Sequence, residues 1–141
     1  MRNQFAFLFS FLLVLASCSN EPNEEVNANA IWQTGKFYYT DSLFGKFLIK
    51  RYDSIQLEYL KMHQLEVQFR MNWLNDSMYE LTFDQVNNNP KEISLPHDLD
   101  SLVKTCTITE ISDTSYVEKA TSNLNDEIIL TTVYLATRGN N

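Results

Sequence analysis

Strict alternation of apolar and polar side chains is the clearest pattern in the chain, and it is longest over residues 65–73. A period of two is typical of a half-buried β-strand, because successive side chains of a strand point to opposite sides. A helix would need apolar residues every three or four positions, and this segment has no such stripe. We therefore predict a strand whose core-facing residues are Leu65, Val67, Phe69, Met71 and Trp73.

The same alternation returns over residues 78–83, after the turn-forming residues 75–77. Six further segments are rich in the β-branched and aromatic residues that suit strands, namely residues 35–40, 46–52, 54–60, 102–111, 115–120 and 127–137. Turn residues separate them, including the run Asn87-Asn88-Asn89-Pro90, and residues 94–100 have room for one short helical turn. The spacing predicts an all-β fold, an antiparallel meander of about seven to eight strands that forms either an open sheet or a lipocalin-like barrel.

The first residues have the form of a secretory signal. Arg2 precedes an apolar run over residues 5–16, which is too short to span a membrane as a helix. The run ends in Leu15-Ala16-Ser17-Cys18, a sequence that resembles the lipobox at which diacylglycerol is attached to a cysteine thiol. We predict that residues 1–17 are a lipoprotein signal peptide and that Cys18 is lipidated, which holds the protein on a membrane.

Residues 18–30 are polar and acidic and read as a lipid-anchored tether, and residues 31–141 as a single β-rich domain. Glu21, Glu24 and Glu25 form an acidic patch just after the lipid site. Such a patch resembles the signal that sends some lipoproteins to the cell surface, although acidic tethers also serve solubility alone. We expect an outer-membrane location, facing either the periplasm or the outside.

Charge and composition narrow the range of functions. The net charge is −7, and the loss of Arg2 with the leader makes it about −8, which disfavours binding to nucleic acid and to anionic lipid headgroups. Three glycines are too few to build a phosphate-binding loop. With Cys18 taken by lipid, Cys106 has no partner for an internal disulfide, and its strand position predicts a buried, unreactive thiol.

A resemblance covers residues 31–83. The resemblance rests on the following residues: Thr34-Gly35-Lys36-Phe37, Ile49, Arg51, Gln56, Glu58, Trp73-Leu74-Asn75-Asp76, Tyr79 and Leu81. In these positions the chain resembles a group of small, largely uncharacterised lipoproteins of Bacteroidetes-type bacteria. Those proteins often have cysteine in place of Ser77 and another near Ile31, so no disulfide carries over. Some of them are described as DNA topoisomerases, which does not fit a small, acidic, exported domain. The resemblance implies anchoring by lipid and supplies no established activity.

Arg51, Gln56 and Glu58 are the most suggestive polar set, because they flank a predicted turn at Asp53 and can meet across a hairpin. One hypothesis is a polar cluster that orients a ligand. The other is ordinary cross-strand pairing, which contributes roughly 0.2–1 kcal/mol per pair and is the interpretation that the sequence favours.

Trp73 and Tyr79 lie on either side of a turn and are the remaining candidates for binding, as a pocket wall or a sugar platform. Aromatic side chains more often belong to the core, and the sequence favours that role for both. His97, Asp98 and Asp100 lie close together, but the only other histidine is His63, so we predict no metal site.

No catalytic constellation or cofactor motif is visible in the sequence, and we expect a protein that is not an enzyme and needs no cofactor. The leading hypothesis is a non-catalytic envelope module on a lipid tether, which contacts an envelope protein or cell-wall material. The alternative is a lipocalin-like carrier of a small apolar ligand, since an eight-stranded barrel can hold one small molecule.

Overall fold

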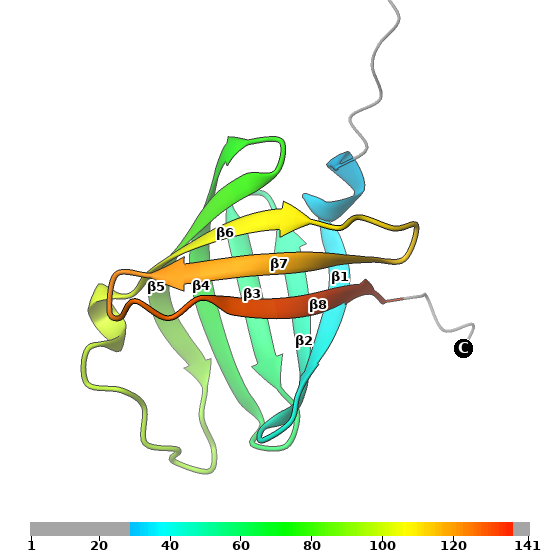
Figure 1. Ribbon diagram of the computed structural model, residues 1–141. Helices are drawn as coiled ribbons and strands as arrows, with labels where there is room; N and C mark the ends of the chain where they lie inside the picture. Colours follow the sequence, from blue (N-terminus) through cyan, green and yellow to red (C-terminus); the bar gives the residue numbers. More distant parts are fainter. Residues whose placement is uncertain (1–28, 137–141) are drawn as a thin grey trace, which may run out of the picture.

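The computed structural model describes residues 29–136, which form an eight-stranded antiparallel barrel (Figure 1). The elements in chain order are the 3-10 helix η1 (Ala30–Trp32), strands β1 (Gly35–Asp41), β2 (Gly45–Tyr52), β3 (Ile55–Leu60), β4 (Leu65–Asn75) and β5 (Met78–Asn88), the 3-10 helix η2 (Leu99–Ser101), and strands β6 (Val103–Thr109), β7 (Ser115–Ser122) and β8 (Ile129–Leu135). Each strand pairs with the next one along the chain, and β8 returns to β1. The all-β meander is confirmed, and the sheet is a closed barrel.

The alternating row in β4 faces the core, as predicted. Leu65, Phe69 and Met71 are buried, and Val67 and Trp73 are partly buried against the core cluster. Trp73 faces the core but is only partly buried, because it lies at the end of the row, where the register of β4 against β5 shifts between Trp73 and Asn75. A strand end cannot enclose a large ring from all sides, so the last residue of the row keeps part of its surface in water.

Two sequence predictions are displaced along the chain: the turn after β5 begins only at Asn89, and the short helical turn is present but lies late in its segment. The asparagine-rich run was expected to be a turn, but β5 continues to Asn88, where Glu66 of β4 is its paired partner. Partner-strand hydrogen bonds outweigh the turn preference of asparagine, a case in which tertiary context overrides propensity. The short helical turn lies at Leu99–Ser101, at the far end of the segment that was expected to hold it.

The barrel has two unlike ends. At one end η1 crosses the opening and buries Trp32 completely, with Asn29 donating a hydrogen bond to the backbone of Asp76 in the β4–β5 turn. We call this the closed end. The other end, which we call the mouth, is bordered by the β1–β2, β3–β4 and β7–β8 turns and by the long connection from β5 to β6 (Figure 1).

The closure between β1 and β8 is short. These strands pair only through Phe37 with Leu135 and Tyr38 with Tyr134, whereas β1 and β2 pair along the whole of β1. Toward the mouth, the remaining residues of β1 have no partner in β8, so the two strands separate there. The barrel wall therefore has a lateral seam that reaches the mouth.

Candidate functional site in the barrel interior

A hydrogen-bonded chain runs along the inner side of the β2–β3 hairpin. Arg51 and Gln56 are directly paired across the two strands, and the Arg51 Nε donates to the Gln56 Oε1 at 2.7 Å. The Gln56 Nε2 donates in turn to the Glu58 Oε1 at 2.8 Å. Asp53 makes the connecting turn with a φ of 51°, a left-handed conformation that aspartate tolerates. The three predicted residues therefore meet: Arg51 and Gln56 form a cross-strand pair, and Glu58 is bonded to Gln56. All three side chains point into the barrel.

Arg51 is the centre of the closed end and is 2% exposed. Its Nη1 donates to the Trp32 carbonyl at 2.9 Å. Its Nη2 donates to the Tyr79 and Tyr116 hydroxyls at 2.6 and 2.8 Å. Every nitrogen of the guanidinium thus has a protein partner, which is the condition under which a buried cation is tolerated.

Glu118 supplies the countercharge. Its Oε2 lies 3.7 Å from the Arg51 Nη2 and accepts hydrogen bonds from the Tyr79 and Tyr116 hydroxyls. Burial disfavours the charge on Arg51, but the oxygens of Tyr79, Tyr116 and Glu118 outweigh it, so the pKa of Arg51 is raised. Burial, followed by the Glu118 charge, raises the pKa of Tyr79. The cluster is therefore a cation–anion pair bridged by two neutral phenols.

Aromatic rings enclose this pair. The Arg51 guanidinium carbon lies 5.1 Å from the Phe37 ring centre and 4.8 Å from that of Tyr79. Trp32 covers the cluster from outside, with its ring centre 4.9 Å from that of Tyr116 in an edge-to-face arrangement. Among the described residues, the Trp32 Nε1 is the only buried side-chain nitrogen or oxygen without a hydrogen-bond partner. The hydrogen-bonding groups of the closed end are thus almost fully saturated, although Arg51 also borders a groove of about 330 Å³ together with Gly35, Lys36, Lys50, Leu135 and Ala136.

Of the two aromatic candidates, Tyr79 belongs to this cluster and Trp73 supports it. Tyr79 is fully buried, and its phenol is the link between Arg51 and Glu118. The ring centre of Trp73 lies 4.8 Å from that of Tyr79. Trp73 does not line the cavity described next, so its place in the fold is that of a packing residue beside the closed end.

Toward the mouth the interior opens into a cavity of about 180 Å³. Its lining combines charged, polar and apolar side chains from six strands: Tyr39, Asp41, Phe47, Ile49, Gln56, Glu58, Lys104, Glu118, Ala120, Ile129 and Thr131. Three of these are carboxylates and one is an amine. Tyr39 and Phe47 form an aromatic wall, with parallel rings whose centres are 4.6 Å apart.

Carboxylates outnumber cations around the cavity, even when Arg51 is counted against Glu118. The Lys104 Nζ lies 3.5 Å from the Glu58 Oε1, and this carboxylate raises the pKa of Lys104 against the opposing effect of burial. Burial raises the pKa of Tyr39, and the charges of Glu58, Glu118 and Asp41 raise it further. Both groups therefore hold their protons more tightly than in water, Tyr39 mainly because of burial and Lys104 because of the Glu58 charge.

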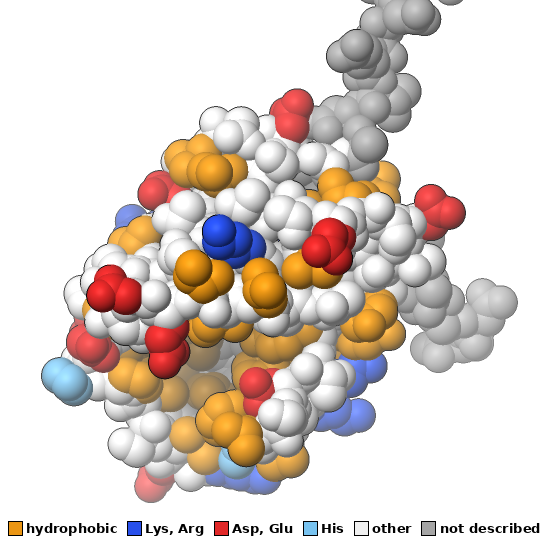
Figure 2. Space-filling view, in the orientation of Figure 1, with side chains coloured by type: hydrophobic (Ala, Val, Ile, Leu, Met, Phe, Trp, Pro, Cys, Tyr) orange, Lys and Arg blue, Asp and Glu red, His pale blue; other side chains and the backbone are white. Residues whose placement is uncertain are grey.

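The cavity reaches solvent at the lateral seam. A groove between β1 and β8 is lined partly by the residues that also line the cavity, including Tyr39, Asp41, Ile129 and Thr131. Figure 2 shows the molecule hollowed below β8, with apolar side chains around the hollow. Ile129 is 55% exposed at this edge, an unusual position for a large apolar side chain in a strand. The seam thus offers an entrance that does not require the barrel to unfold.

Several residues of this interior were not singled out from the sequence: Trp32, Tyr39, Lys104, Tyr116 and Glu118. A signal for two of them exists in β7, where Tyr116, Glu118 and Ala120 share one face of an alternating strand. A carboxylate between two core residues predicts a buried charge with a partner. The partner itself cannot be found in this way, because Arg51 lies on a strand 65 residues away from Tyr116.

Cys106 is fully buried, as predicted, and burial followed by the charge of Glu118 raises its pKa.

No group of three or more metal-ligating side chains occurs within residues 29–136, the part that includes His97, Asp98 and Asp100. Within the same residues, no helix has the length and apolar character needed to cross a membrane. The predicted signal peptide, Cys18 and the acidic patch lie outside the described residues.

Comparison with known proteins gives no relative. No family model matches the chain, and neither a curated protein nor a solved structure is significantly similar to it. The resemblance to Bacteroidetes-type lipoproteins stays a prediction.

Proposed function

We propose that this protein is a lipid-anchored, non-catalytic binding module of the bacterial envelope, and that its mouth cavity takes a small cationic ligand such as an amine. The observation that carries the proposal is the lining of the cavity: Asp41, Glu58 and Glu118 line one space with Lys104. Glu118 is paired with Arg51 and Glu58 with Lys104, so among the described residues the carboxylate of Asp41 is in excess over these two cations. A ligand ammonium group would bring the cavity closer to neutrality. The seam between β1 and β8 gives it a route of entry.

The aromatic wall supports a cationic ligand. A cation over the face of a tyrosine or phenylalanine ring is attracted by the ring quadrupole, and the Tyr39–Phe47 pair lies beside the carboxylates. Among residues 29–136, only one oxygen each of Glu58 and Glu118 has hydrogen-bond partners, so the other oxygen of each remains as an acceptor. Carboxylate acceptors beside an aromatic face are the groups that recognise ammonium ions.

Size and polarity distinguish this ligand from the apolar one that the fold alone suggests. The cavity of about 180 Å³ lies below the range of roughly 300–1,000 Å³ typical of drug-sized ligands. A molecule of a few heavy atoms fits that space. Burying an apolar ligand there would remove water from three carboxylates without replacing their hydrogen bonds, which is unfavourable.

The chemistry of the interior supports binding without catalysis. Cys106 is the one thiol in the described part of the chain, and its raised pKa keeps the nucleophilic thiolate rare near neutral pH. The tyrosine hydroxyls of the closed end are held between Arg51 and Glu118 and do not line the cavity.

Calorimetric titration with a panel of small amines, and with neutral and acidic molecules of the same shape, tests this function. We expect saturable binding of amines only. Glu58→Gln should weaken binding roughly tenfold, because it removes one charge-assisted hydrogen bond. Asp113→Asn, on the exposed β6–β7 connection, removes the same charge far from the cavity and should leave binding unchanged.

Two other results would redirect the proposal. Binding of apolar molecules without binding of amines would support the carrier of an apolar ligand. An absence of binding by every class would leave the envelope interaction module without a ligand site. The anchor has its own test: intact-mass measurement of the protein from its producing cell should show residues 1–17 absent and a lipid on Cys18, and an unmodified cysteine would refute it.

A further inference from the structure

The outer side of four neighbouring strands is positively charged, although the net charge of the protein is negative. Outward-pointing side chains of β8, β1, β2 and β3 include three lysines and several aromatic and aliphatic residues, and none of them is a carboxylate. We call this surface the lysine face and define it by Lys36, Lys46, Lys50, Tyr38, Leu48, Tyr52, Leu57, Tyr59 and Tyr134. Glu58, on β3, points inward to the cavity and does not contribute to it.

The lysines of this face have no anionic partner. Lys36 and Lys50 lie directly opposite each other on β1 and β2, and like charges in that position repel. Neither they nor Lys46 has a carboxylate within 4 Å among the described residues. The only charge-related contacts of Lys46 and Lys50 are with the rings of Tyr38 and Tyr52, at 4.0 and 5.0 Å. An anion placed over this pair would relieve the repulsion.

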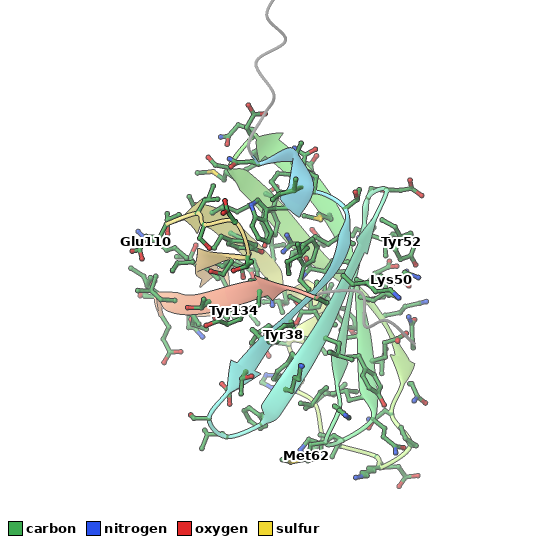
Figure 3. The ribbon with its side chains drawn as sticks, turned by 90° about the vertical axis from the view of Figure 1, so that its right-hand side faces the viewer. Tyr38, Lys50, Tyr52, Met62, Glu110 and Tyr134 are labelled. Atoms are coloured by element: carbon green, nitrogen blue, oxygen red, sulfur yellow. The ribbon has the colours of Figure 1, made fainter. Side chains whose placement is uncertain are left out.

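Aromatic and aliphatic side chains surround the lysines. Tyr38 and Tyr134 stack on each other across the β1–β8 junction, with ring centres 5.3 Å apart. A shallow groove beside them is lined by Leu48, Leu57 and Tyr59. Figure 3 looks onto this side of the barrel, where Tyr38, Lys50, Tyr52 and Tyr134 project from neighbouring strands. Glu66 of β4, which accepts a hydrogen bond from Asn87, marks the border of the face.

We propose that the lysine face docks on an anionic membrane surface, with the lysines among the lipid headgroups and the tyrosines at the interface. Charge complementarity is the basis: three unpaired cations and no carboxylate on one face of a protein whose net charge is −7. Tyrosine suits the boundary between water and acyl chains, and lysine can lay its stem on apolar surface while its amine stays polar. The overall charge argues against anionic lipid only when it is averaged over the whole molecule.

A membrane fits this face better than an acidic peptide. An extended peptide binds a sheet by adding hydrogen bonds to an open edge, but β2 is paired on one side with β1 and on the other with β3. The backbone of β2 therefore has no free edge to offer, and at Lys36 the backbone of β1 is bonded to Ala136. The unpaired part of β1 lies beyond Tyr38, at the seam. A layer of headgroups needs no free edge, because it meets only the side chains.

Lysine footprinting tests the docking on the whole protein, purified from its producing cell and held on vesicles by the lipid that the proposed function places on Cys18. Acetylation of each lysine by an amine reagent is followed by mass spectrometry, in vesicles of neutral lipid and in vesicles with a third of anionic lipid. We expect Lys36, Lys46 and Lys50 to react roughly fivefold more slowly on the anionic vesicles. Lys91 and Lys119, outside the face, should react equally on both, and added salt should abolish the difference.

A pair of matched variants separates the face from net charge. Lys36→Glu with Lys50→Glu should abolish the protection of Lys46, whereas Lys91→Glu with Lys119→Glu changes the charge equally and should preserve it. Equal reactivity of Lys46 on neutral and anionic vesicles would overturn the proposal. Protection of the face by soluble polyglutamate but not by anionic vesicles would overturn it as well, since the occupant would then be an acidic polypeptide.

Discussion

The two halves of the barrel interior are both polar, but they differ in how many of their polar groups have partners within the protein. At the closed end every nitrogen of Arg51 is bonded, Glu118 neutralises it, and Trp32 covers both. At the mouth, Glu58 and Lys104 form one long contact of 3.5 Å beside a cavity, and their side chains are 12% and 27% exposed. Polar groups whose hydrogen bonds are all made within the protein indicate a structural cluster. Carboxylate oxygens that have no partner and lie beside a cavity indicate a binding site.

Removal of Arg51 should have the largest effect on the free energy of unfolding. Arg51→Met leaves Glu118 without its cation and the Trp32 carbonyl without its donor, and breaking a buried ion pair costs about 3–5 kcal/mol. The midpoint of urea unfolding measures this. Adding Glu118→Gln to Arg51→Met should recover part of the loss, because the uncompensated charge is gone. If Arg51→Met unfolded within about 1 kcal/mol of the parent, the closed end would not be a structural cluster.

The two tryptophans differ in burial, so their removal should cost different amounts of stability. Trp32→Ala, which uncovers the closed end, should cost about 3–5 kcal/mol, the range for large-to-small changes in a core. Trp73→Ala should cost about half as much, because that ring is only partly buried beside Tyr79. Glu66→Ala serves as the surface control and should change stability by less than about 0.5 kcal/mol. Thermal melts of the three variants should give this order, and equal losses for the two tryptophans would refute it.

Periodicity predicts the architecture well and the interior only in part. The β4 row, the strand sequence and the burial of Cys106 follow from local alternation, which a single sequence displays. The meeting of Arg51 with Gln56 also follows, because a tight turn makes them neighbours. Glu118 and Lys104 were missed, since their partners come from strands that only the closure of the barrel brings near. The cavity is likewise a product of closure, and no local pattern encodes it.

High pH should destabilise the fold through both halves. Cys106, Tyr39, Tyr79 and Tyr116 all have raised pKa values in the folded protein, mainly through burial. Between the ordinary and the raised pKa the folded state holds more protons than the unfolded chain, so stability falls as pH rises. The fall should begin near pH 9, the ordinary pKa of cysteine, and steepen above pH 10, that of tyrosine.

The expected slope is about 1.4 kcal/mol per pH unit for each proton that only the unfolded chain releases. Urea unfolding at a series of pH values from 7 to 11 measures it. Cys106→Ala should remove the part of the slope between pH 9 and 10 and leave the steeper part unchanged. A stability that stays constant up to pH 10.5 would mean that these groups are accessible to water in the folded state.

Among the changes inside the barrel, the smallest effect on stability is expected at the mouth, and it is the most informative. Glu58→Gln keeps the shape of the side chain and its hydrogen bond from Gln56, and it leaves Lys104 facing a cavity that reaches solvent through the seam. The cost should therefore stay near 1 kcal/mol, the upper range for an ion pair that water can reach. The same variant is the one expected to lose amine binding. A binding site is marked by this combination, in which a charge matters more to a ligand than to the fold. If Glu58→Gln instead destabilised the protein as much as Arg51→Met, Glu58 and Lys104 would belong to one structural network with the closed end, and the cavity beside them would have no role in recognition.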